Sequence, residues 1–241
     1  MIEITTKLRA CPEAGPAPSG YEEYLQTDLL LSLQKDRSVA ANPDELVFQI
    51  VHQSSELWLK FVGAEIADAT ACLERGDVHG ASRHLRRAAS GFERVIDHVH
   101  MLEQVSPIDY LDIRAVLGNG AGFDSPGFRR LHELAPHLWA AFRALVESRG
   151  ATLLDLYVHR TARPELHDLA EQLVEWDAQM MRWRLSHLCL VERMLGEQAV
   201  GTQRTPVAVL RKRVALKYFG ALWDVRAQLA RERETPATPA V

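Results

Sequence analysis

Cysteine is scarce in this chain, and its scarcity excludes two kinds of stabilising framework. Only 3 cysteines occur in 241 residues, the number is odd, and no two of them form a Cys-x-x-Cys pair. A disulfide-stapled extracellular fold and a zinc site built from cysteines therefore find no support. We expect a protein of the reducing cytoplasm.

Long hydrophobic runs and an excess of basic charge are also missing. No apolar stretch approaches the roughly 18 residues that cross a bilayer, and the N-terminal segment carries charges where a secretory signal would be apolar. The formal net charge is -4. We therefore expect neither nucleic acid nor a membrane as a partner. Hydrophobic residues at 47% and charged residues at 25% are typical of a globular protein.

The chain is expected to form one globular unit between two irregular ends. Residues 1–19 are rich in proline and glycine and predict an irregular N-terminal arm, whereas residues 231–241 predict a flexible tail. Neither a linker nor an internal repeat divides residues 20–230, so we expect these to be a single domain.

Apolar residues recur at helical spacing throughout this domain. The spacing predicts long helices over residues 43–74, 77–104 and 164–196, and shorter ones over 21–35, 107–117, 130–148, 152–159 and 206–230. Pairs such as Ser106-Pro107 and Ser125-Pro126 are typical of helix starts, where serine caps the helix and proline fits its first position. No period-two strand pattern stands out. The predicted fold class is all-α, a bundle of long helices.

Ten histidines prompt a search for metal sites. The chain has no His-Glu-x-x-His motif and no Glu-x-x-His repeat of the kind that builds di-iron bundles. A multi-histidine metal centre thus has little support. A single axial histidine for haem stays open, because haem needs only one protein ligand.

His187 and His52 are the histidines that such a site would use. His187 lies on an apolar stripe at helical spacing that includes Met180, Trp183, Leu190 and Met194. His52 shares a helix face with Phe48 and Ser55, on a segment that is apolar all round and is expected to be buried. For either residue, periodicity alone fits a core histidine bonded to a neighbouring group at least as well as a ligand contact.

Tyr110 and Arg114 lie one helical turn apart and can address one ligand from one face. Arginine presents a planar donor fork that suits a carboxylate, and tyrosine adds a hydroxyl and a ring. The alternative is a surface arginine paired with a nearby acid, for which Asp109, Asp112 and Glu103 are available.

Taken together, these segments resemble the tryptophan 2,3-dioxygenase family of haem-dependent aromatic oxygenases. Four blocks match in order and span about residues 21–226: Tyr21 to Leu30, Asp44 to Lys60, Leu102 to Ser125, and Trp183 to Thr202. The stretch His52-Gln53-Ser54-Ser55-Glu56-Leu57-Trp58-Leu59-Lys60 is the most distinctive.

The resemblance implies an all-α bundle that encloses haem b, a homotetramer, and a reaction of O2 with L-tryptophan or a substituted tryptophan. It places His187 at the proximal iron ligand and His52 at the distal histidine that hydrogen-bonds the indole N–H. Arg114 and Tyr110 match the residues that hold the amino-acid carboxylate and close the pocket. Further matches are Phe48, a pocket aromatic; Thr202, near the substrate's ammonium and carboxylate; and Tyr21, Tyr24 and Leu25, which a neighbouring subunit inserts over the active site.

The implied reaction inserts O2-derived oxygen at the indole C2–C3 bond and gives an N-formylkynurenine-type product. The chain departs from the family at Gly201-Thr202-Gln203-Arg204-Thr205-Pro206, which replaces a glycine-rich loop, and at Ala121, where the family commonly has serine. These departures leave open a monooxygenase of the same superfamily that gives a 2-oxindole-type product from tryptophan or methyltryptophan. A non-catalytic haem sensor and a plain helical interaction protein are the remaining alternatives.

Overall fold

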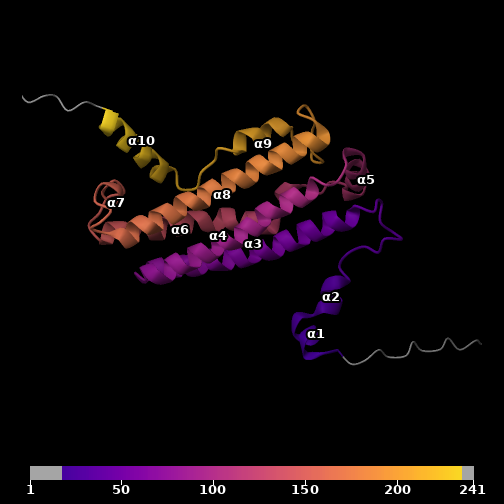
Figure 1. Cartoon of the computed structure of the whole chain (residues 1–241), viewed down its shortest axis with the longest axis horizontal. Helices are drawn as coiled ribbons and strands as arrows, with labels where there is room; N and C mark the ends of the chain where they lie inside the picture. The colour runs from indigo at the N-terminus through magenta and orange to yellow at the C-terminus, as the bar shows by residue number, and fades with distance from the viewer. Residues whose placement is uncertain (1–17, 235–241) are drawn as a thin grey trace, which may run out of the picture.

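The structure, a computed structural model, describes residues 18–234, and helices account for most of them (Figure 1). The α-helices are α1 (Gly20–Leu25), α2 (Thr27–Leu31), α3 (Glu45–Glu74), α4 (Val78–Leu102), α5 (Pro107–Leu117), α6 (Pro126–Ser148), α7 (Asp155–Val158), α8 (Pro164–Leu195), α9 (Val207–Arg213) and α10 (Gly220–Glu234), with a short 3-10 turn, η1 (Gly122–Asp124), before α6. Within the described residues the one extended pairing is an isolated bridge between Val200 and Pro206. The predicted all-α class is confirmed.

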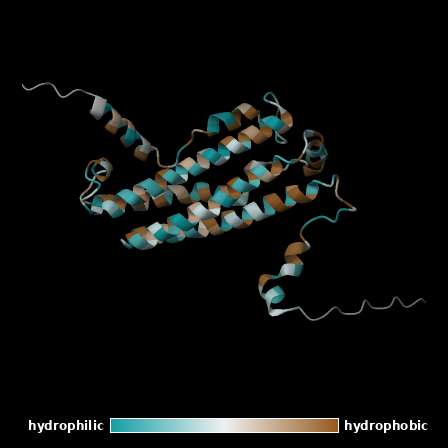
Figure 2. Cartoon of the chain, viewed as in Figure 1, coloured by the Kyte–Doolittle hydropathy of each residue, from teal (hydrophilic) through white to brown (hydrophobic). Residues whose placement is uncertain are grey.

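Four long helices make the body of the molecule. α3 packs against α4 and α6, and α4 packs against α8, so that the four lie side by side along the long axis (Figure 1). Their shared interior is apolar, with the aromatic side chains of Phe92 and Phe142 fully enclosed. Burying each such side chain stabilises the fold by about 1.5–3 kcal/mol. Figure 2 shows the corresponding alternation of hydrophobic and hydrophilic stripes along the helices.

The serine-proline pairs begin helices, as predicted. Ser106 Oγ accepts the amide N–H of Asp109 at 3.2 Å, and α5 begins directly after it at Pro107. Ser125 Oγ accepts the amide N–H of Phe128 at 3.2 Å. α6 therefore begins at Pro126 rather than at the predicted residue 130. The capping signal located this helix start better than the apolar spacing did.

Two predicted helices are each split in two. The segment 21–35 breaks at Gln26, whose φ of 53° lies in the left-handed region. The segment 206–230 is interrupted between α9 and α10, where the fully buried carboxylate of Asp177 accepts the amide N–H groups of Tyr218 and Phe219 at 2.7 and 3.0 Å. Those amides are thereby withdrawn from helical bonding, which explains the break.

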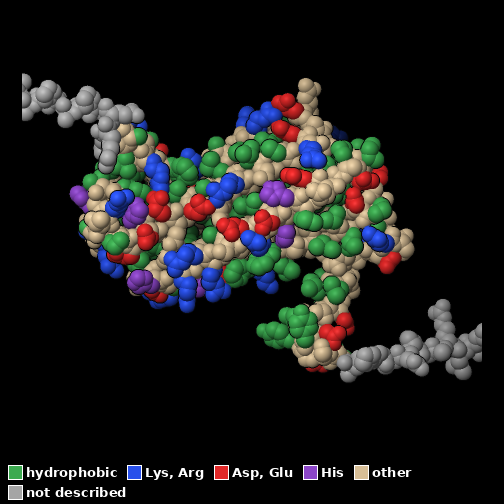
Figure 3. Space-filling model, viewed as in Figure 1, with side chains coloured by type: hydrophobic (Ala, Val, Ile, Leu, Met, Phe, Trp, Pro, Cys, Tyr) green, Lys and Arg blue, Asp and Glu red, His purple; other side chains and the backbone are tan. Residues whose placement is uncertain are grey.

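The α1–α2 segment stands away from the bundle (Figures 1 and 3). Tyr21 is 70% exposed and Tyr24 87% exposed, and the neighbouring leucines add to an apolar surface that the rest of the chain leaves uncovered. The connection that follows is fastened to α3, because Gln34 Nε2 donates to Gln53 Oε1 at 2.6 Å. The helical spacing does not predict this separation, whereas the resemblance, which places this segment over a neighbouring subunit, agrees with it.

The outer face of α3 is also uncovered. Ile50, Leu57 and Trp58 are exposed, so the expectation that this helix is buried on all sides is wrong. Apolar residues on every side of a helix indicate burial only where other elements cover each face, and here one face has no cover from the same chain.

The predicted irregular arm and tail lie outside the described residues apart from residues 18–19 and the end of α10. Among the described helices, none is both long and apolar enough to cross a membrane.

Candidate active site

Candidate residues of three helices, α3, α5 and α8, lie at one end of the bundle, where α5 closes the body of the molecule (Figure 1). A small buried cluster there joins α4, α5 and α8, and its members are Val99, Val105, Ile113, Leu190 and Met194. Phe48 of α3, Tyr110 of α5 and Trp183 of α8 pack against this cluster. The apolar stripes that predict these helices thus also position the polar groups of the site.

His52 projects from α3 with a defined protonation pattern. Its Nδ1 lies 2.7 Å from the carbonyl oxygen of Phe48. A carbonyl only accepts hydrogen bonds, so Nδ1 carries the proton and Nε2 is left with its lone pair. Burial by the surrounding protein lowers the pKa of His52 below its usual 6.5, more strongly than the Phe48 hydrogen bond raises it. At neutral pH His52 therefore presents an uncharged acceptor.

The His52 ring faces a hollow instead of the packed interior. The ring is exposed by area although burial dominates its pKa, a combination expected of a group that lines a cleft. A hollow of about 260 Å³ lies beside it. Its lining comprises Lys35, Glu45, Phe48, Gln49, His52, Gln53, Ile113, Val116 and Leu117. This volume is below the roughly 300–1,000 Å³ of a typical small-molecule site.

His187 lies on α8 as a neutral, unpartnered imidazole. Desolvation, with a smaller contribution from the nearby His52, lowers its pKa to about 4, so the two rings lie within electrostatic reach of each other. The ring stacks on Trp183 with centroids 5.1 Å apart and an interplanar angle of 4°. Neither ring nitrogen has a hydrogen-bond partner in the described part of the chain.

These properties fit the axial ligand of a haem. A haem iron takes one protein imidazole, which must be neutral and must have a free nitrogen. His187 meets both conditions, and its half-buried ring is not sealed among aliphatic side chains. Within the described residues, no group of three or more His, Cys, Asp or Glu is placed to hold a metal ion.

Trp183 and Glu56 fix the surroundings of these two histidines. Trp183 lies against Phe128 with ring centroids 4.1 Å apart, which joins α8 to the first turn of α6. That turn is held from α3, where Glu56 accepts the hydroxyl of Ser125 and the amide N–H of Gly127, the latter at 2.9 Å. Sequence reasoning missed both roles, since each depends on a contact between distant helices.

Tyr110 and Arg114 share one face of α5, as their spacing predicts. Burial raises the pKa of Tyr110, and the charge of Arg114 opposes that rise, so the two side chains are close. The Tyr110 ring lies 6.5 Å from the Phe48 ring, centroid to centroid. Arg114 forms no ion pair among the described residues, and its Nη2 donates instead to the carbonyl oxygen of Val200 at 2.7 Å. Its remaining N–H donors are available to an anion.

Thr202 is brought to the same end of the bundle by the loop after α8. Its Oγ1 donates to the carbonyl oxygen of Gly120 at 2.6 Å, which seats the loop on the segment between α5 and α6. Ala121, the residue beside this contact, offers no side-chain hydroxyl.

Tyr21, Tyr24 and Leu25 are not brought to the site by their own chain. All three lie on α1 and are exposed, and Leu25 is 45% accessible.

A hydrogen-bonded pair that the sequence does not predict lies closer to the site, where Ser55 Oγ and His98 Nδ1 are 2.9 Å apart. Ser55 shares a face with His52, but its partner on α4 could be found only from the fold.

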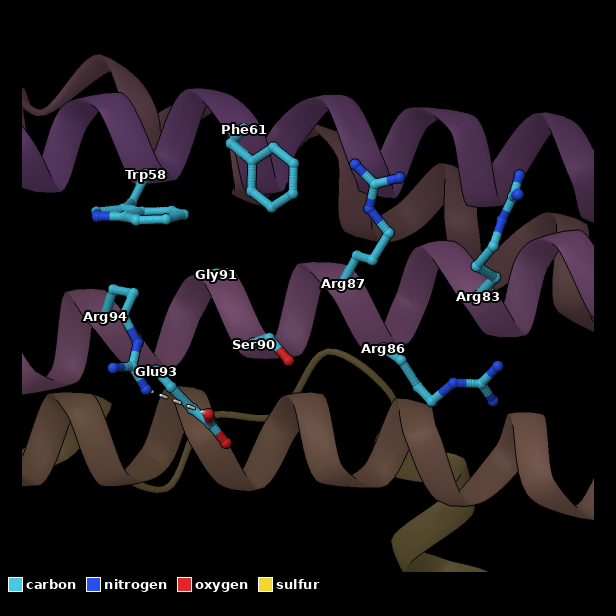
Figure 4. Close-up of a pocket in the computed structure, with 9 residues that line it drawn as sticks. All are labelled: Trp58, Phe61, Arg83, Arg86, Arg87, Ser90, Gly91, Glu93 and Arg94. Atoms are coloured by element: carbon cyan, nitrogen blue, oxygen red, sulfur yellow. Dashed lines mark ion pairs between the residues drawn. The ribbon is translucent and has the colours of Figure 1, made fainter.

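A second, larger hollow of about 560 Å³ lies on the outer surface between α3 and α4 (Figure 4). Trp58 and Phe61 of α3 line it together with four arginines of α4, Arg83, Arg86, Arg87 and Arg94, of which Arg87 and Arg83 point toward α3. None of the candidate site residues lines this hollow. It is therefore a surface feature separate from the two histidines.

Known proteins match the chain over nearly its whole length. The family model described as tryptophan 2,3-dioxygenase matches residues 10–138 and 139–229. A tryptophan 2,3-dioxygenase of Ruegeria pomeroyi is 30% identical over 87% of this chain and 92% of that protein. One of Xanthomonas campestris pv. campestris is 28% identical over 90% of this chain and 89% of that protein, and one of a Nocardioides species is 29% identical over 87% and 94%.

Proposed function

The chain belongs to the tryptophan 2,3-dioxygenase family, and from this we propose that it is a haem-dependent oxygenase acting on L-tryptophan or a substituted tryptophan. The observation that carries the proposal is the presence of two neutral imidazoles, on α3 and α8, within electrostatic reach of each other. His187 has a free nitrogen for an iron, and His52 has an unprotonated Nε2 for a substrate N–H. A haem and an indole that lie between the two imidazoles would use both of these nitrogens.

His187 would hold haem b through one ring nitrogen, with Trp183 stacked against the imidazole. When bound, the haem supplies an iron that activates O2, chemistry for which the protein has no side chain of its own. The protein contributes the orientation of the imidazole. Trp183 restricts the ring on one side, and Phe128 holds Trp183 in turn.

The substrate would lie with its indole toward His52 and its carboxylate toward Arg114. His52 Nε2 accepts the indole N–H, because Nδ1 is occupied by Phe48. Arg114 donates to the carboxylate, and Phe48 and Tyr110 contribute apolar contacts to the ring. Anchoring both ends of the substrate fixes the C2–C3 bond relative to the haem, and such positioning lowers barriers by up to about 7–11 kcal/mol in ideal cases.

A second subunit would complete this site in a homotetramer. The α1–α2 segment exposes an apolar surface on one side of the molecule, and the hollow beside His52 is open on its own. Tyr21, Tyr24 and Leu25 would cover the active site of a neighbour. Exposed apolar surface of this kind marks an interface with a protein partner.

The number of oxygen atoms inserted decides between two activities of the same site. A dioxygenase returns both atoms of O2 to an N-formylkynurenine-type product. A monooxygenase would return one atom, in a 2-oxindole-type product, and would need two electrons from a reductant. Two local features favour the monooxygenase as the alternative: Gln203 fastens the loop beside the carboxylate site, and Ala121 lacks a hydroxyl.

Incubation of the ferrous, haem-loaded protein with L-tryptophan and methylated tryptophans under 18-oxygen tests both activities. Two labelled atoms in the product, formed without continuous reductant, support the dioxygenase. One labelled atom, formed only with reductant, supports the monooxygenase. No oxygenated product from any indole amino acid would contradict the proposal.

A further inference from the structure

We propose that Gln203 is a positioning residue that holds the loop after α8 closed over the carboxylate end of the site before substrate arrives. The inference deepens the proposed function and rests on it for the identity of the substrate. The closed loop itself, however, is a property of the protein alone and can be measured without turnover.

Gln203 fastens the loop to the segment between α5 and α6 with one amide group. Its Nε2 donates to the carbonyl oxygen of Asn119 at 3.2 Å and to Asp124 Oδ2 at 2.8 Å. The same Asp124 oxygen accepts the amide N–H of Ala121 at 3.0 Å, which fixes the acceptor in place. Only a side chain with two N–H donors at this length makes both contacts, and a glycine would make neither.

Backbone hydrogen bonds hold the loop together, so a fastening at one residue restrains its neighbours. The amide N–H of Gly201 donates to the Thr205 carbonyl at 2.8 Å, and that of Val207 donates to the Ala199 carbonyl at 3.2 Å. Between them Arg204 turns the chain with a φ of 56°. The tip formed by Gln203 and Arg204 is exposed, and the Gln203 contacts tie it back to the body.

Closure places two substrate-binding groups. Val200 accepts a hydrogen bond from Arg114, which orients the guanidinium, and Thr202 gives its hydroxyl proton to Gly120. Thr202 Oγ1 then has only lone pairs to offer, which suits the ammonium of an α-amino acid and not its carboxylate. A closed loop therefore presents a carboxylate donor and an ammonium acceptor together, so the site is organised for an amino-acid zwitterion in advance.

Limited trypsin digestion of the full-length, haem-loaded protein tests this closure without substrate. Cleavage after Arg204 requires the loop to open, and its rate follows the population of open loop. Gln203→Ala should raise the rate of this cleavage, read by mass spectrometry, about fivefold or more, as expected for losing hydrogen bonds of ordinary strength. Gln198→Ala is the matched control, because Gln198 is exposed in the same loop and makes no side-chain hydrogen bond.

Gln203→Glu separates hydrogen bonding from size. It keeps the length of the side chain but places a second carboxylate against Asp124, so cleavage should be at least as fast as in Gln203→Ala. Wild-type cleavage rates in both variants would overturn the inference. Equal acceleration in Gln198→Ala would overturn it as well, because the effect would then not be specific to Gln203.

A second test measures the effect of Gln203→Ala on substrate binding. In Gln203→Ala the KM for the indole amino acid should rise several-fold while kcat stays near the wild-type value, since closure is restored in the bound state. Saturating substrate should also slow cleavage after Arg204 in this variant. If cleavage of Gln203→Ala is faster but no indole amino acid slows it, the proposed function is contradicted and the fastening role of Gln203 stands. If the KM of Gln203→Ala equals that of the wild type, the role of Gln203 in substrate positioning is contradicted.

Discussion

His52 and His187 belong to one residue type, and their surroundings leave their ring nitrogens in different hydrogen-bonding states. His52 Nδ1 donates its proton to the Phe48 carbonyl, so Nε2 is unprotonated and can accept a hydrogen bond. His187 has no such partner and leaves a nitrogen available to a metal. Sequence spacing could not distinguish these states from those of two core histidines, because it reveals neither the hydrogen-bond partners nor the hollow.

Substrate affinity should depend on pH through His52. Burial lowers the pKa of this residue below 6.5, so Nε2 is unprotonated at pH 7 and becomes protonated only as the pH falls through that lowered value. Protonation removes the acceptor for the indole N–H, so the dissociation constant should rise on the acid side and stay flat above pH 7. Spectroscopic titrations across pH 5–8 measure it. A tryptophan analogue methylated at the indole nitrogen is the control, and an equal acid limb for both ligands would contradict the assignment.

Arg114 should contribute strongly to substrate binding. Removing one partner of a buried charge pair costs about 2–5 kcal/mol, so Arg114→Ala should weaken L-tryptophan binding by that amount. Arg114→Lys keeps the charge and loses the planar fork, and we expect an intermediate loss. Spectroscopic titration of the haem-loaded variants gives the dissociation constants. Wild-type affinity in Arg114→Ala would remove the carboxylate-binding role.

Among the helices, the attachment of α10 depends on one buried carboxylate. Asp177 accepts two backbone N–H groups and, at 3.1 Å, the indole Nε1–H of Trp223. Asp177→Ala leaves these three buried or part-buried donors without their acceptor. The free energy of unfolding should fall by about 2–4 kcal/mol, as expected for a broken buried network. Urea denaturation measures it, and Asp168→Ala on the exposed face of α8 is the control. If Asp177→Ala lowers the free energy of unfolding by no more than Asp168→Ala does, the role of Asp177 in attaching α10 is contradicted.

The helices could be predicted where their own residues determine them. α5 follows Ser106-Pro107 over the expected range, and α8 ends at Leu195 before Gly196, one residue from the predicted end. The break between α9 and α10 could not be predicted in this way, because it depends on a contact with Asp177, which is 41 positions from Tyr218 in the sequence. The same holds for the site. The resemblance predicted a set of site residues, but the contacts of Trp183, Glu56 and Gln203 exist only in the folded chain.

For the molecule as a whole, the exposed α1–α2 segment predicts that active sites depend on neighbouring subunits. A full-length variant with Tyr24→Asp and Leu25→Asp should lose most activity although its own His187 is intact. Mixing and reassembling it with His187→Ala, which has an intact segment and no iron ligand, should restore activity to roughly a quarter of wild type if subunits assemble at random. Activity no greater than the sum of the separate variants would show that the segment does not act on a neighbour.

Absorption spectroscopy of the haem-reconstituted protein tests the haem and the substrate together. We expect the wild type to bind haem with a strong Soret band that shifts when L-tryptophan is added, and His187→Ala to lose the band while His98→Ala retains it. A His187→Ala protein with full haem occupancy and an unchanged spectrum would contradict the ligand assignment. A wild-type band that no indole amino acid shifts would favour a haem sensor, and the absence of any band after reconstitution would favour a plain helical interaction protein.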